Sequence, residues 1–174
     1  MAATVNVQEL SGVGGDAATV TAARMCTTDT NNPGATYPIP IPDADVNYSY
    51  WKTWRLAFTG TFTQVTNVYI YTDGTGFGTG ITTNIGDSTG MTYVQATGTA
   101  GTTGLELNNT NYDGVTDVTD FFSFTSGSQK EVDTTTITTE TTFSKVIAVQ
   151  LEIATSATAG TLAAETVTWQ YDEI

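Results

Sequence analysis

Threonine takes the place of charged residues through most of this chain, and this constrains the fold more than any other feature. The 174 residues include 39 threonines, whereas only 13% are charged, against roughly a quarter in typical soluble domains. Threonine is β-branched and favours extended backbone, and its hydroxyl allows a strand to face water. Helical surfaces are usually built from Lys, Glu, Arg and Ala instead. The sequence therefore predicts a domain made mostly of exposed strands.

Apolar and polar residues alternate in many segments, as they do in strands with one buried face. Val5 and Val7 begin this pattern, and Val68–Tyr71 is apolar on both faces, which favours a central strand. The other expected strands are Tyr48–Phe58, Phe62–Thr72, Ile81–Ile85, Met91–Thr97, Val118–Phe124, Lys145–Ala154 and Thr166–Asp172, with weaker candidates at Thr19–Cys26 and Thr134–Thr142. Lys52 interrupts the apolar face of its segment, whereas Gln150 lies on the polar face of its own. About eight to ten such strands predict an all-β, single-domain antiparallel β-sandwich that is jelly-roll-like.

All four prolines lie within the segment from Pro33 to Pro42. Proline has no N–H to donate to a strand ladder, so this segment cannot be a central strand and is expected to be an extended, polyproline-like arm. We therefore divide the chain into an extended N-terminal segment and arm (1–42) and a main sandwich (43–174).

The charge balance is strongly acidic, with 5 basic and 18 acidic residues and a net charge of −13. Such a surface repels phosphate backbones and anionic membranes, so neither nucleic acid nor membrane is expected as a partner, whereas cations and basic partners are compatible with it. Cys26 is the only cysteine. It excludes an intrachain disulfide, and we expect it to be a small buried side chain.

The chain contains no histidine. This excludes Ser-His-Asp and Cys-His catalysis, histidine metal ligation and zinc sites of the Cys/His type. The many carboxylates could supply a glycosidase pair, but no pair stands out. We therefore predict a protein that is not an enzyme, with no catalytic residues.

One loop has the spacing of an EF-hand-type calcium site, with oxygen-bearing side chains at alternate positions around a glycine. The candidate ligands are Asn109, Asn111, Asp113, Asp117 and Asp120. The loop departs from the motif because Asn109 replaces the usual first Asp and Asp120 the usual Glu, and because its flanks are strand-like. Calcium is the one cofactor that the sequence suggests, and an Asn/Asp-rich β-turn loop without metal is the alternative.

Two aromatic side chains are candidates for a binding surface. Trp51 falls on the polar face of its segment, and Phe77 lies in a glycine-rich loop. Exposed aromatic rings can stack on sugars or seal a subunit interface. Trp51 could equally pack on a neighbouring sheet or arm of the same chain.

Three segments resemble small virion proteins of tailed bacteriophages, of the head-decoration (capsid-stabilising) type. These segments are YSYWKTWRLAF (Tyr48–Phe58), FTGTFTQVTNVYIYTDGTGFGTGI (Phe58–Ile81) and SKVIAVQLEIATSATAGTLAAETVTWQYDE (Ser144–Glu173). They cover 64 of the 174 residues, somewhat more than a third of the chain, and contain no catalytic or ligand motif. The resemblance implies a β-rich module that binds a capsid or tail lattice in many copies, often as a trimer.

The resemblance leads us to expect a structural virion protein that decorates a capsid, with the major capsid protein or other virion proteins as partners. Met1–Leu10 has no apolar run of signal-peptide length, so we expect synthesis in the host cytoplasm and a place in the virion. Met1–Leu10 and Asn32–Pro42 are expected to contact neighbouring subunits or the capsid. The predicted interface residues are Pro38, Ile39, Pro40, Ile41, Pro42 and Trp51. A glycan-binding β-sandwich module of a tail or adhesin is the alternative function.

Overall fold

A computed structural model describes residues 2–87 and 92–174, and within them it contains thirteen strands and one short 3-10 helix. The elements are β1 (Thr4–Ser11), β2 (Asp16–Thr19), β3 (Val46–Tyr48), β4 (Lys52–Thr59), β5 (Val65–Thr72), β6 (Ile81–Asp87), β7 (Gly98–Thr99), β8 (Thr103–Gly104), β9 (Asp117–Asp120), η1 (Phe121–Ser123), β10 (Lys130–Asp133), β11 (Thr142–Phe143), β12 (Ile147–Ala154) and β13 (Val167–Glu173). The strands pair antiparallel in every ladder. The predicted all-β, antiparallel class is confirmed.

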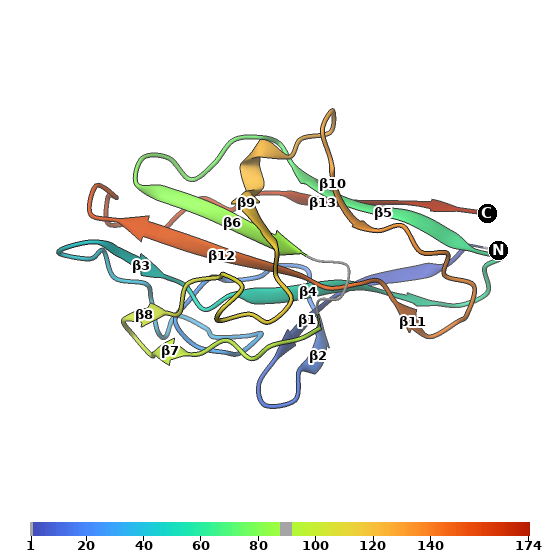
Figure 1. Cartoon of the computed structure of the whole chain (residues 1–174), viewed down its shortest axis with the longest axis horizontal. Coiled ribbons are helices and arrows are strands. Elements are labelled where there is room, and N and C mark those ends of the chain that lie inside the picture. Colours follow the sequence, from blue (N-terminus) through green and yellow to red (C-terminus); the bar gives the residue numbers. More distant parts are fainter. Residues whose placement is uncertain (1, 88–91) are drawn as a thin grey trace.

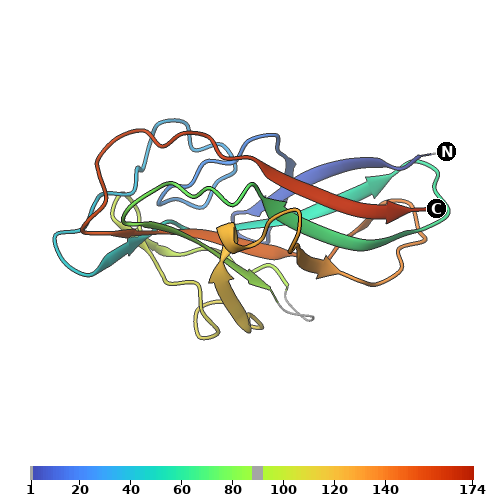
Figure 2. The same ribbon diagram turned by 90° about the horizontal axis from the view of Figure 1, so that it is seen from above.

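The strands form two main sheets that lie face to face. The large sheet has the order β2-β1-β4-β12-β6-β9, with β11 beside β4 and β3 beside β12, and the small sheet has the order β10-β5-β13. In Figure 1 the small sheet lies above β4 and β1 of the large sheet, and the view from above in Figure 2 shows β5 and β13 crossing over these strands. The sheets are unequal in size, with eight strands in the large sheet and three in the small one, and the jelly-roll-like arrangement stays a prediction. The fold is an antiparallel sandwich, and β5 is central in its sheet as predicted.

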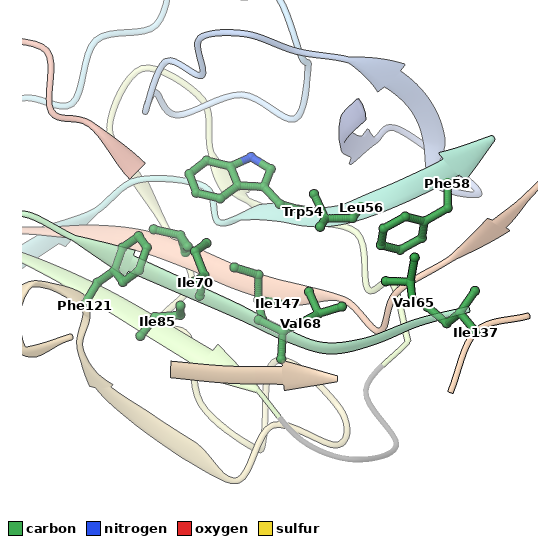
Figure 3. Packing of buried hydrophobic residues seen from close by; sticks show 12 residues of the cluster. Trp54, Leu56, Phe58, Val65, Val68, Ile70, Ile85, Phe121, Ile137 and Ile147 are labelled. Atoms are coloured by element: carbon green, nitrogen blue, oxygen red, sulfur yellow. The ribbon is translucent and has the colours of Figure 1, made fainter. Parts of the chain in front are cut away.

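The main core lies between the two sheets and is built from the alternating apolar residues that marked the strands. Figure 3 shows side chains of β4 meeting those of β5, with Phe121 and Ile137 at the two ends of the cluster. The buried members are Trp54, Leu56, Phe58, Val65, Val68, Ile70, Ile85, Phe121, Val132, Ile137, Ile147 and Val149. Burying a side chain of this size contributes about 1.5–3 kcal/mol, so this cluster holds the two sheets together.

A second layer covers the opposite face of the large sheet. It is formed by the segment 92–116, which we call the loop layer. This segment includes the small β7–β8 hairpin on the lower side of Figure 1. The buried residues of this second core are Leu10, Tyr50, Trp51, Ala96, Leu107, Tyr112, Val115, Val146 and Ala148. Both faces of the large sheet are therefore covered, which the alternation pattern did not predict.

Gln150 ties this second layer to the sheet. Its side chain is fully buried; Oε1 accepts a hydrogen bond from the Leu107 N–H, and Nε2 donates to the carbonyls of Ser49 and Leu105 at 2.8 Å each. A buried amide is tolerated when its donors and acceptors are satisfied in this way. Gln150 does lie on the face opposite the apolar residues of its strand, but segment 92–116 covers that face.

The N-terminal segment is part of the sandwich rather than an arm. β1 pairs with β4 over seven residue pairs, from Thr4↔Thr59 to Leu10↔Thr53, and Val5 and Val7 pack against the main core. The predicted boundary at residue 42 is therefore wrong, because residues 4–11 are a strand of the large sheet. The physical reason is that the backbone N–H and C=O groups of β1 already bond within the large sheet. Contact of Met1–Leu10 with a neighbouring subunit or the capsid stays a prediction.

Two of the weaker strand predictions are also wrong. Only Thr19 of Thr19–Cys26 lies in a strand, and Thr134–Thr142 makes one isolated bridge at Ile137 before β11 begins at its last residue. In the threonine-rich segment, the Asp133 carboxylate accepts bonds from the N–H and hydroxyl of Thr135, which turns the chain away from an extended path. Met91 lies outside the described residues, and 92–97 contain no strand. Cys26 is fully buried, as predicted.

Across the described ranges, no helix is both long and apolar enough to span a bilayer.

Candidate functional site

Trp51 is buried inside the chain and is not an exposed aromatic platform. Its side chain is only 2% exposed, its ring lies 5.4 Å from that of Tyr112, and its Nε1 donates to the Val94 carbonyl at 2.9 Å. The prediction of Trp51 as an interface residue is therefore wrong, and the alternative in which it packs against another part of the chain is confirmed. The face that holds Trp51 is covered by the loop layer, and a Cβ at Gly104 in that layer would collide with the Ser49 carbonyl.

The proline-rich segment runs without a strand along the surface, as expected. Pro38 and Pro40 are exposed, while Ile39, Ile41 and Pro42 are half-buried. The segment is held to the chain by the Thr27 N–H, which donates to the Tyr37 carbonyl, and by the Asn47 amide, which donates to the Pro40 carbonyl at 2.9 Å. Its contact with a partner stays a prediction.

The five candidate calcium ligands are distributed over a loop, a strand and a helix cap. Asn109 and Asn111 donate their amide N–H groups to the carbonyls of Val115 and Glu106. Asp113 is exposed. Asp117 lies in β9 and pairs with Lys130, whereas Asp120 caps η1 by accepting from the Phe122 N–H at 3.0 Å. The loop is thus closed by hydrogen bonds of its own, and calcium binding stays a prediction.

A metal-removal experiment decides between the two hypotheses for this loop. Because the carboxylate of Asp117 is paired with Lys130 and that of Asp120 accepts from the Phe122 N–H, we expect EDTA and millimolar Ca²⁺ to leave the melting temperature unchanged. Differential scanning calorimetry of the wild-type chain measures this directly. A site that binds calcium only in the folded state would raise the melting temperature with Ca²⁺ concentration, and that result would restore the calcium hypothesis.

Phe77 lies near a shallow, polar hollow at one end of the sandwich. Its ring packs edge-on against Phe122 with centroids 5.7 Å apart. The hollow, of about 370 Å³, is lined by Gly74, Gly76, Gly78, Ile81, Thr82, Thr83, Asp120, Phe122 and Ser123. A ring beside hydroxyl and carboxylate groups has the chemistry to contact a sugar, so this hollow is one candidate site for a small polar ligand. A larger open hollow of about 550 Å³ lies beside the Asn/Asp loop, where Asn84, Glu106 and Asn109 form part of its lining.

A buried ion pair explains why Lys52 interrupts an apolar face. Lys52 and Glu9 are 2% and 0% exposed, and their Nζ and Oε1 atoms lie 3.1 Å apart. Lys52 also donates to the Thr30 carbonyl, and the second carboxylate oxygen of Glu9 accepts from Trp54 Nε1 at 3.2 Å. Each charge therefore has two partners, which is the condition under which a buried pair is tolerated.

Three of the four other basic side chains also have partners within the chain. Lys130 is 7% exposed and pairs with Asp87 at 2.9 Å and Asp117 at 3.2 Å. Lys145 pairs with Asp133, and Arg55 stacks on the Phe143 ring at 3.5 Å. Arg24 is exposed. Four of the five basic side chains are thus satisfied by this chain itself, and the exterior is left predominantly acidic.

Asp133 is a carboxylate that the fold holds in its charged form. Burial opposes ionisation, but bonds from the Thr135 hydroxyl and N–H, from the Lys145 N–H, and the Lys145 charge together lower its pKa below 3.8. A lowered pKa in the folded state stabilises the fold above the pKa of the unfolded chain, and this contribution is lost as the pH falls through the folded value.

This arrangement predicts a pH-dependent cost for Asp133→Asn. We expect the variant to lose about 1–3 kcal/mol at neutral pH, since bonds to a charged acceptor are replaced by weaker ones. The difference from wild type should shrink as the pH falls through the lowered pKa of Asp133, since both chains then carry an uncharged group. Urea titrations from pH 7 to pH 2 measure the effect, and a difference that stays constant over that range would contradict it.

Comparison with protein-family models, curated proteins and solved structures found no match to the chain.

Proposed function

We propose that this protein is a structural subunit of a virus particle that binds the capsid lattice in many copies, as a decoration or stabilising subunit. The observation that carries the proposal is the inward use of the basic side chains, which leaves an acidic, threonine-rich exterior on a well-packed sandwich. Such a surface suits attachment to a basic partner. The resemblance of Tyr48–Phe58 and the two other segments to virion proteins of tailed bacteriophages supports the same conclusion.

Lattice binding requires area and complementarity rather than reactive groups. The chain has no histidine, which fits a binding protein better than an enzyme. A single small contact would be weak, but several linked contacts reinforce one another. A homo-oligomer, with a trimer favoured by the resemblance, would supply this multivalency, and the proline-rich segment is one surface available to it.

Electron microscopy of the particle that contains this chain tests the proposal. We expect density for the sandwich, repeated at symmetry-related positions on the shell. Mass spectrometry of the purified particles should find the chain in a fixed ratio to the major shell protein. A chain that is absent from particles, or that works as a free monomer turning over a small molecule, would overturn the proposal.

The hollow beside Phe122 favours one alternative, a glycan-binding module of a tail or adhesin. A glycan array distinguishes this function, with Phe122→Ala as the variant that removes the ring from the hollow. Trp51→Ala is unsuitable for this purpose, because removing a buried aromatic side chain costs about 3–5 kcal/mol of stability. Binding of a defined glycan that Phe122→Ala abolishes would support the alternative.

A further inference from the structure

The small sheet has one face in the core and one face toward solvent. Val68 and Ile70 of β5 are fully buried between the sheets, so Tyr69 and Tyr71, which alternate with them, point to the outer side. Both tyrosines are half-buried. In Figure 2, β5 and β13 lie on the near side of the molecule, over the large sheet. Two aromatic rings therefore stand side by side on an open β-surface.

The neighbours of these rings on the flanking strands are polar or acidic. Glu131 of β10 and Gln170 of β13 lie on either side of Tyr69, and Thr168 lies beside Tyr71. Glu131 and Gln170 are exposed. We call this surface the tyrosine face, and it consists of Tyr69, Tyr71, Gln129, Glu131, Thr168, Gln170 and Asp172.

Hydrogen bonds hold the polar side chains of the tyrosine face in place. Gln129, which directly precedes β10, donates from Nε2 to Gln170 Oε1 of β13 at 2.8 Å. Asn67 Nδ2 donates to the Asp172 carboxylate at 2.7 Å. Side chains fixed before binding lose less entropy when a partner arrives, so this surface is partly preorganised for contact.

The charge of the tyrosine face has one sign. Glu131 and Asp172 are exposed carboxylates, whereas Lys130, the lysine of β10, turns inward to Asp87 and Asp117. The face thus combines aromatic rings with uncompensated negative charge. Arginine and lysine side chains bind both, since they stack on aromatic rings and pair with carboxylates. Tyrosine is also enriched where proteins meet.

We propose that the tyrosine face is the surface by which this protein docks onto a basic patch of a protein partner. The inference rests on the proposed function, in which that partner is the protein that forms the particle shell. Arg or Lys side chains of the partner stack on Tyr69 and Tyr71 and pair with Glu131 and Asp172. Docking is expected to be stronger at low ionic strength, because salt screens the attraction between the acidic face and the basic partner.

Co-sedimentation tests the proposal with particles purified from cells in which the gene for this chain is disrupted. Full-length wild-type chain is added back over a range of concentrations and of NaCl. Glu131→Lys reverses one charge on the tyrosine face, and Asp16→Lys makes the same change at the exposed start of β2, in the large sheet. Tyr69→Thr and Tyr71→Thr remove the rings with a residue that favours strands. Thermal melting confirms that each variant is folded.

We expect Glu131→Lys and the two tyrosine variants to weaken binding by about tenfold or more, and Asp16→Lys to bind like wild type. Added salt should weaken wild-type binding and should have less effect on Glu131→Lys. If the Glu131→Lys, Tyr69→Thr and Tyr71→Thr variants bind particles as well as the wild-type chain does, the docking face is overturned and the proposed function is left intact. Wild-type chain that does not bind particles at all would overturn both.

A sugar is the other class of ligand that two tyrosines could contact, and the same variants exclude or reveal it. The docking proposal predicts no glycan-array signal that depends on Tyr69 or Tyr71. Salt-independent binding of a neutral glycan, lost in Tyr69→Thr and retained in Glu131→Lys, would replace the proposed protein partner by a carbohydrate.

Discussion

Replacing Lys52 with methionine is expected to lower the free energy of unfolding by about 3–5 kcal/mol. The substitution keeps much of the side-chain volume but removes the charge that faces Glu9, whose carboxylate is fully buried 3.1 Å from Lys52 Nζ. The carboxylate would retain its bond from Trp54 Nε1 and lose its counter-ion. A buried charge without a partner costs far more than a surface charge, because water cannot replace the missing interaction. Urea denaturation followed by tryptophan fluorescence measures the loss.

A double variant separates the loss of a partner from the loss of packing. Glu9→Gln combined with Lys52→Met removes both charges and keeps an amide oxygen that can accept from Trp54. We expect this pair to be more stable than Lys52→Met alone, because neither side chain then leaves a buried charge behind. The stability costs of Glu9→Gln alone and of Lys52→Met alone should add up to more than the cost of the double variant. If the cost of the double variant equals their sum, the role assigned to the ion pair is contradicted.

The apolar alternation along the chain predicted the strands of the main core well. Val68 and Ile70 alternate with two tyrosines, and Ile147 and Val149 follow the same pattern, so burial between sheets could be inferred locally. The sequence also showed Lys52 as an interruption. Its partner Glu9 lies 43 positions earlier, and only the register between β1 and β4 brings the two charges together. A pattern that is read within one strand contains no information about that register.

The loop layer explains the errors about the candidate site. Trp51 and Gln150 both lie on a side of the large sheet that looks polar in the sequence, yet segment 92–116 covers that side. Its residues have little alternation, so nothing local predicted that they would pack there. The tyrosine face differs from this layer. The apolar run Val68–Tyr71 predicted a central strand, and β5 is central in the small sheet, but the sheet leaves the side of Tyr69 and Tyr71 open.

Deleting Met1–Leu10 is expected to abolish folding, whereas an extended latch could be removed without loss of structure. The deletion removes nearly all of β1, exposes the edge of β4 along seven residue pairs and takes Glu9 away from Lys52. It also removes Val5 and Val7 from the core. Together these losses exceed the roughly 5–15 kcal/mol by which domains of this kind are stable. Circular dichroism and thermal melting of the truncated chain measure the effect, and a cooperative transition near the wild-type temperature would contradict it.

Adding the missing strand as a separate peptide provides the matched control. A peptide with the sequence of residues 1–12 can occupy the vacant edge of β4, because an extended strand binds an exposed sheet edge through main-chain hydrogen bonds. We expect it to restore a cooperative melting transition to the truncated chain in a concentration-dependent manner. The same peptide carrying Glu9→Leu should restore folding less well, since it leaves Lys52 buried without a carboxylate. Equal rescue by both peptides would show that strand pairing alone completes the fold and that the ion pair contributes little to it.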